Sequence, residues 1–192
     1  GANDSGSGVG VLLELARVLG GDAARKCLPA TQPSIWIAFL DGEECSLSFG
    51  AQDGLHGSRH LARQLVEKGL RDRVKAVILL DMIGDRDLTV TLPRNGTPEL
   101  LALAFRAAEE EGVRSSFFLF PGAILDDHQP FLDAGMPAVN LIDFEFGSHP
   151  RLNDYWHTEQ DSLDKLSARS LATMGRVVIR MVNTLRVLSE TR

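Results

Sequence analysis

Acidic and histidine side chains follow the ends of four short apolar runs in this sequence. Carboxylate oxygens and imidazole nitrogens can bind metal ions and transfer protons, so their repeated position is informative. In open sheets of parallel strands, ligands bind beyond the carboxyl ends of the strands, so the pattern predicts one polar site at one sheet edge. The side chains are Asp41, Glu43, Glu44, Asp81, Asp126, Asp127, His128 and His157.

Glu43 and Glu44 are adjacent carboxylates that follow the apolar run 35–40. Like charges a few ångströms apart oppose each other and raise a pKa, and a bound cation would relieve this repulsion. Zn²⁺ accepts His nitrogen and Asp or Glu oxygen atoms, and a catalytic zinc has three protein ligands and one open position. We therefore interpret the pair as one metal ligand and one base for proton transfer.

Each of these signals also has a simpler interpretation. Taken alone, the Glu43-Glu44 pair fits a solvated loop, and His157 beside a tryptophan fits a surface or core histidine. Asp4 fits a carboxylate at a helix start, and the carboxylates at 126–127 fit a helix cap. The coincidence of all these residues at strand ends favours a functional site.

Short apolar runs alternate with helical patterns along the chain. Strands are predicted at 35–40, 76–80, 117–120 and 138–142, and a further antiparallel or edge strand at 88–92. Helices are predicted near 7–19, 58–68, 98–111, 127–134 and 168–188. This alternation is typical of an α/β fold, with a mostly parallel sheet covered by helices on both faces.

The composition is that of a globular protein and narrows the classes of partner. The chain has 192 residues, of which 44% are hydrophobic and 24% charged, and this argues for one domain and against a disordered chain. Lys and Arg number 20 against 26 Asp and Glu, a net charge of −6 that disfavours a nucleic-acid partner. No apolar run is long enough to predict a membrane span.

Five segments, in this order, carry a resemblance: GANDSGSGVGVLLELARVL, FLDGEECSLSFGAQDGLHGSRHLA, VILLDMIG, ILDDHQPFLDAGMPAV and YWHTEQDSLDKL. Together they resemble the zinc-dependent peptidase family M28 and, within it, the glutaminyl-peptide cyclotransferases (glutaminyl cyclases). The resemblance implies a three-layer α/β/α, zinc-aminopeptidase-like (phosphorylase/hydrolase-like) fold with a mostly parallel central sheet. Residues 1–192 would then form a single M28-like catalytic domain, or more exactly its carboxyl-terminal portion.

The resemblance also implies the metal chemistry. Asp4, Glu44 and His157 match the three ligands of a zinc ion, one per chain, and Glu43 matches the acid/base glutamate. The implied reaction forms pyroglutamate at the N-terminus of a peptide or protein and releases ammonia. The partner would be that peptide N-terminus, without nucleic acid or a membrane span.

Five further residues receive roles from the same resemblance. Asp81 and Asp126 match a carboxylate network beside the metal in the cyclases, and Ser5 is a further candidate for this network and the substrate site. Trp156 matches a tryptophan of the substrate pocket. Phe49 stands where animal cyclases carry another pocket tryptophan, so we expect Phe49 and Trp156 to form an apolar wall that holds the substrate and excludes water.

Two features favour the cyclase branch over the aminopeptidases of the same family. The segment between Glu44 and Gly57 holds 12 residues, which is long as in the cyclases, and the DDHQPF motif is cyclase-like. One departure is Asn140, which stands where animal cyclases carry a network histidine. The alternative is an M28 aminopeptidase with two zinc ions, one bound by Asp81, which requires a further histidine upstream of Asp4. A non-catalytic domain of this fold is disfavoured because the ligands and Glu43 are all present.

The start of the chain carries a last expectation. In the resembling families the turn that holds Asp4 follows a strand well inside the domain. We therefore expect roughly a third of the fold upstream of Gly1, and an exposed sheet edge near 35–40 or near Gly1 unless upstream chain covers it. The family is often exported, which favours a secreted or periplasmic location. The oligomeric state is not predicted.

Overall fold

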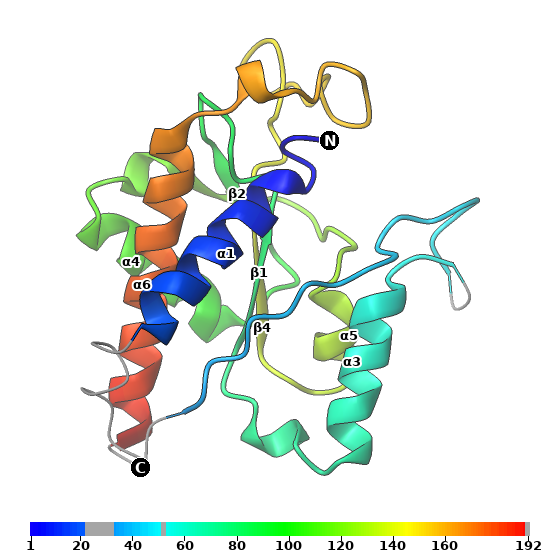
Figure 1. Cartoon of the computed structure of the whole chain (residues 1–192), viewed down its shortest axis with the longest axis vertical. Coiled ribbons are helices and arrows are strands. Elements are labelled where there is room, and N and C mark those ends of the chain that lie inside the picture. Colours follow the sequence, from blue (N-terminus) through cyan, green and yellow to red (C-terminus); the bar gives the residue numbers. More distant parts are fainter. Residues whose placement is uncertain (22–32, 51–52, 191–192) are drawn as a thin grey trace.

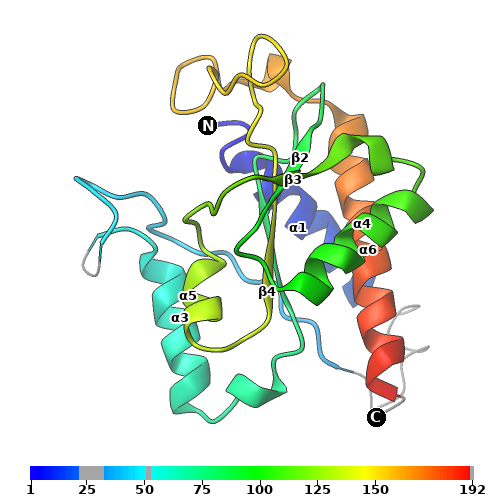
Figure 2. The ribbon, with the colours of Figure 1, turned by 180° about the vertical axis from the view of Figure 1, so that it is seen from behind.

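The computed structural model describes residues 1–21, 33–50 and 53–190. The helices are α1 (Gly6–Gly20), α3 (His56–Glu67), α4 (Pro98–Glu110), α5 (Gln129–Asp133) and α6 (Ala168–Glu190), and three short 3-10 turns lie between them. The strands are β1 (Val77–Asp81), β2 (Val90–Pro93), β3 (Phe117–Phe120) and β4 (Ala138–Ile142). Figures 1 and 2 show the strands between the helices from opposite sides.

The strands pair in parallel, as the α/β pattern predicts. β1 pairs with β4 from Val77↔Ala138 to Asp81↔Ile142, and β2 pairs with β3. β2 lies beside β4, where the Thr91 hydroxyl donates to the Ile142 carbonyl (3.1 Å) and accepts the Phe144 N–H (3.0 Å). The fold is therefore an α/β fold whose paired strands end at one edge.

Helices cover both faces of the strands because successive side chains of a strand point to opposite sides. Val139 and Leu141 of β4 belong to a core cluster formed with α1, α4 and α6. Ala138, on the opposite face, packs with residues of α3 and α5 in a second cluster. This arrangement gives the predicted three layers.

Two strand predictions need correction. Residues 35–40 form no strand: Trp36 is 66% exposed and Phe39 53% exposed, and among the described residues β1 pairs only with β4. A strand requires a neighbour for its backbone hydrogen bonds, and no described strand pairs with this segment. The strand predicted at 88–92 corresponds to β2, which is fully buried and runs parallel to β3, so the antiparallel alternative is wrong.

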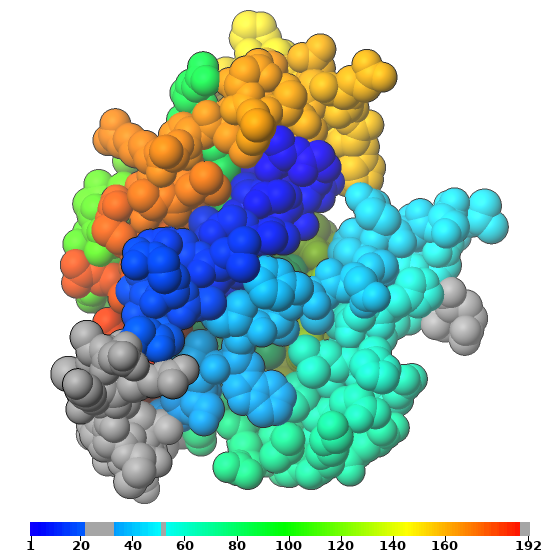
Figure 3. All heavy atoms as spheres, viewed as in Figure 1, coloured from blue at the N-terminus to red at the C-terminus, as the bar shows by residue number. Residues whose placement is uncertain are grey.

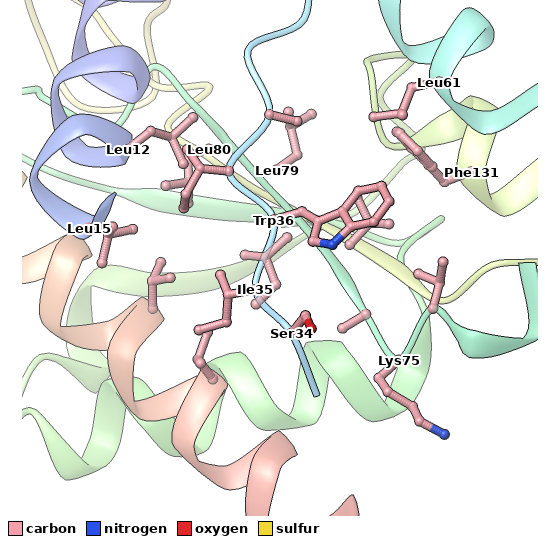
Figure 4. Close-up of a pocket in the computed structure, with 18 of the residues that line it drawn as sticks. Leu12, Leu15, Ser34, Ile35, Trp36, Leu61, Lys75, Leu79, Leu80 and Phe131 are labelled. Carbon is pink, nitrogen blue, oxygen red and sulfur yellow. The ribbon is translucent and has the colours of Figure 1, made fainter. Parts of the chain in front are cut away.

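The segment 33–40 lies across a cavity of about 880 Å³ from β1. Figure 4 shows Leu79, Leu80, Ile35 and Trp36 among the side chains that line this cavity. The lining is mainly apolar. The edge of β1 opposite β4 therefore faces this cavity rather than another described strand. No helix in the described part of the chain is both long enough and apolar enough to span a membrane.

Candidate metal centre

Asp4 lies on a turn that is fixed to the end of β1. Asn3 is fully buried and its side-chain oxygen accepts the Gly84 N–H (2.8 Å). The Ser7 hydroxyl donates to the Asn3 carbonyl (2.7 Å) and accepts the Ile83 N–H (3.0 Å). α1 approaches β1 so closely that a side chain at Gly8 would collide with the carbonyl of the strand. The turn is thus held directly beyond the end of β1.

Glu43 and Glu44 lie on the loop 41–57, whose base is closed by backbone hydrogen bonds. The N–H groups of Leu55, His56 and Gly57 donate to the carbonyls of residues 43, 42 and 41, at 2.8, 2.9 and 2.8 Å. A side chain at Gly57 would lie 2.7 Å from the Asp41 backbone, so this closure requires glycine there. The closure fixes where Glu43 and Glu44 leave the base of the loop.

His157 lies on the loop between β4 and α6, in a left-handed backbone conformation (φ 57°). The Thr158 hydroxyl donates to the Tyr155 carbonyl (2.8 Å) and tightens the turn around it. The imidazole stacks on Trp156 with ring centroids 3.9 Å apart. The ring plane of His157 is therefore set by its neighbour, while 45% of its side chain remains exposed.

The three predicted ligands converge. His157 Nε2 lies 2.8 Å from Glu44 Oε1 and 3.4 Å from Asp4 Oδ2, and one ligand atom from each residue lies within 4.8 Å of the others. Ligand atoms around a tetrahedral zinc lie about 3.4 Å apart. The Glu44 side chain is 57% exposed and free to adjust its distance. One nitrogen and two carboxylates fit a catalytic zinc, and Figure 3 shows the surface hollowed between the segments that carry them.

A second layer of carboxyl groups lies beside this cluster. Burial, with the charges of Asp126 and Glu44, raises the pKa of Glu43 to about 8. Burial and Asp126 also raise the pKa of Asp81 well above its usual range. Asp126 accepts the Asn140 amide (2.5 Å) and the Asp127 N–H (2.6 Å), yet burial raises its pKa to about 7. Burial and mutual repulsion thus favour the protonated forms of these three carboxyl groups.

The predicted apolar wall is only partly assembled. Trp156 contacts Phe144 edge to face, with ring centroids 5.4 Å apart, and Phe144 contacts Phe120 in turn. Phe49 packs instead against Gly54 within its own loop, and the described rings show no contact between it and Trp156. Ser5 is exposed at the start of α1. Phe144 is thus the aromatic partner of Trp156 that the sequence did not predict.

Two other supporting residues received no role from the sequence, although His128 belongs to the predicted polar pattern. His128 is fully buried, its Nε2 lies 2.9 Å from the side-chain nitrogen of Asn95, and burial lowers its pKa to about 4. Neutral His128 thus fastens the loop that carries Asp126. Asp161 accepts two N–H groups from the Asp4 turn. The sequence signal that could have indicated this role is the position of Asp161, four residues after His157.

The family model for peptidase family M28 matches residues 1–182, and the chain therefore belongs to this family. The fold agrees: the crystal structure of the Acidobacteriales bacterium glutaminyl cyclase superposes with a TM-score of 0.87 at 39% identity. That match covers 97% of this chain and 62% of the other.

Two curated relatives carry different names. The glutaminyl-peptide cyclotransferase-like protein of Bos taurus is 33% identical over 93% of this chain and 50% of its own length. Aminopeptidase YwaD of Bacillus subtilis is 32% identical over 95% of this chain and 37% of its own. The chain thus spans about half the length of the curated cyclotransferases that it matches. The family is shared, and the two names define the alternatives for its activity.

Proposed function

We propose that this chain carries the metal centre of a zinc-dependent glutaminyl-peptide cyclotransferase. The observation that carries the proposal is the convergence of Asp4, Glu44 and His157 beside Glu43, a carboxyl with a pKa near 8. The similarity to proteins named glutaminyl cyclases supports it. When bound, zinc would polarise the γ-carbonyl of an N-terminal glutamine. A peptide or protein N-terminus is thus the proposed substrate, and on family resemblance alone we propose export from the cytoplasm.

Glu43 is the proposed acid/base group. It lies next to the ligand Glu44 in the chain, is half-buried, and lies close enough to Glu44 and Asp4 for their charges to raise its pKa. As a carboxylate it would take a proton from the attacking α-amine, and as a carboxylic acid it would return this proton to the leaving amide nitrogen. The new bond joins the α-nitrogen to the carbonyl carbon of the side-chain amide (Cδ), the bond from that carbon to the side-chain nitrogen breaks, and ammonia leaves.

Asp81 and Asp126 are proposed to share a proton, because two neighbouring buried carboxyls do not both ionise readily. Asp126 accepts two N–H donors, from Asn140 and from the backbone of Asp127, and these favour its ionised form. The proton is therefore placed mainly on Asp81. A protonated Asp81 is a poor ligand for a second metal ion, which favours the one-zinc reaction.

The alternative is an aminopeptidase, which the similarity to YwaD favours. In that case Glu43 would activate a water molecule, and Asp81 would be ionised and bind a second zinc. The two reactions differ in their product: cyclisation releases ammonia, whereas the peptidase releases an amino acid.

The test uses the full-length protein that contains this sequence. Ammonia release from Gln-initiated peptides is compared with cleavage of Leu- and Ala-anilides, and zinc is counted per chain. We expect ammonia release, with one zinc and no anilide cleavage. Glu43→Gln is assayed in the same way to test the acid/base group. Glu159→Gln makes the same chemical change at an exposed position near His157 and is the matched control. Anilide cleavage with two zinc ions and no ammonia would refute the cyclase assignment.

A further inference from the structure

Asp161 is a buried carboxylate that joins two segments of the metal centre. Its side chain is 4% exposed. Oδ1 accepts the backbone N–H of Asn3 at 2.6 Å, and Oδ2 accepts that of Asp4 at 3.0 Å. The Asp161 carbonyl accepts the Ala2 N–H at 3.3 Å. The turn that presents one ligand is thus bound to the loop that presents another.

Aromatic contacts of Tyr155 with Phe146 and of Trp156 with Phe144 hold the His157 loop before the histidine, and Asp161 holds it after the histidine. Residues 156–160 are all exposed, so burial contributes little to their position. The Asp161 N–H donates to the Thr158 carbonyl at 3.1 Å, which closes the turn between His157 and Asp161. The Asp4 turn, in contrast, is anchored to the end of β1 through Asn3. Asp161 therefore ties the exposed His157 loop to the anchored Asp4 turn.

We propose that Asp161 is a positioning residue that sets the distance between the ligands Asp4 and His157. The inference rests on the metal centre of the proposed function and applies equally to a cyclase and a peptidase. The 3.4 Å separation of His157 Nε2 from Asp4 Oδ2 already equals the spacing around a tetrahedral zinc. A carboxylate can accept from two N–H donors at once, whereas an amide presents N–H₂ to one of them. Removing the charge-assisted pair therefore releases the loop.

The experiment compares Asp161→Asn with Asp164→Asn in the full-length protein. Both changes remove one negative charge from the same segment, but the Asp164 side chain is 70% exposed. Zinc affinity is measured by competition with a chromophoric chelator, and the ligand field by the visible spectrum of the Co²⁺-loaded protein. Residues that orient metal ligands change affinity by roughly 10- to 100-fold. We expect a loss of this size and an altered Co²⁺ spectrum for Asp161→Asn, and less than a twofold change for Asp164→Asn.

Two outcomes would overturn the positioning role. One is a folded Asp161→Asn protein that binds zinc within twofold of the wild type with an unchanged Co²⁺ spectrum. If Asp161→Asn does not fold, Asp161→Glu is measured instead, because it keeps both acceptor oxygens but lengthens the side chain. The second overturning outcome is wild-type zinc affinity in Asp161→Glu. Wild-type protein that binds no zinc refutes the metal centre itself, whereas zinc binding without ammonia release refutes only the cyclase reaction.

Discussion

Asp143 follows β4 as a fully buried carboxyl group. Oδ2 accepts the Thr89 N–H at 2.8 Å and Oδ1 accepts the Glu145 N–H at 3.0 Å. Burial outweighs these two donors and raises the pKa of Asp143 to about 8. An aspartate in the unfolded chain has a pKa of about 3.9. Between these values the folded protein holds a proton that the unfolded chain has lost.

The sign of the pH dependence follows from this difference. Because the folded state binds more protons, the free energy of unfolding falls as the pH rises from about 4 to about 8. The slope is about 1.4 kcal/mol per pH unit, so two units cost about 2.7 kcal/mol and the whole window on the order of 5 kcal/mol. The amide of Asp143→Asn cannot ionise, so the stability of this variant lacks the pH dependence that Asp143 causes. The variant also loses one acceptor, which costs about 1 kcal/mol at every pH.

The assay is urea unfolding of the metal-free protein at pH 5.5, 6.5, 7.5 and 8.5. We expect the free energy of unfolding of Asp143→Asn to rise relative to wild type by about 1.4 kcal/mol per unit up to about pH 8. Asp87→Asn, an exposed change on a neighbouring loop, should run parallel to wild type. Parallel curves for Asp143→Asn and wild type would refute the buried, protonated Asp143.

Three other perturbations test the site and the core. Glu43→Gln in the full-length protein should bind zinc normally and lower kcat by about 10²- to 10⁴-fold, and undiminished turnover would exclude Glu43 as the acid/base group. His157→Ala removes the nitrogen ligand and should abolish the rise in Tm that zinc produces in the wild type, as scanning calorimetry can show. Phe117→Ala empties a fully buried position and should cost about 3–5 kcal/mol in urea unfolding. A loss below 1 kcal/mol would place Phe117 outside the core.

Part of the fold could be predicted because buried strands appear in the sequence as short apolar runs, several of them followed by an acidic residue. The runs at 76–80 and 138–142 correspond to β1 and β4, and Asp81 does lie at a strand end. The run at 35–40 has the same character but forms no strand. An apolar run records a preference for burial, whereas a strand also requires a partner. The direction of β2 was missed for a similar reason, since alternation along one strand says nothing about its neighbour.

The candidate site shows the same division. The family motifs predicted the convergence of Asp4, Glu44 and His157, because ligand residues are tied to recognisable local sequence. The residues that support them were not predictable in this way. Asp161 acts through backbone N–H groups more than 150 positions away in the chain, and Phe144 meets Trp156 only because the loop after β4 folds back. Such contacts depend on tertiary geometry that spacing does not encode.

The loop 41–57 contains two separate sets of hydrogen bonds. Its base is closed between residues 41–43 and 55–57, whereas the Asp53 carboxylate collects the N–H groups of residues 46, 47 and 48 farther out. No described residue of the loop belongs to both of these sets. The hydrogen bonds that hold residues 46–48 are thus separate from those that fix the backbone beside Glu43. Under the proposed function, residues 46–48 can therefore change in sequence while the acid/base group keeps its place in the backbone.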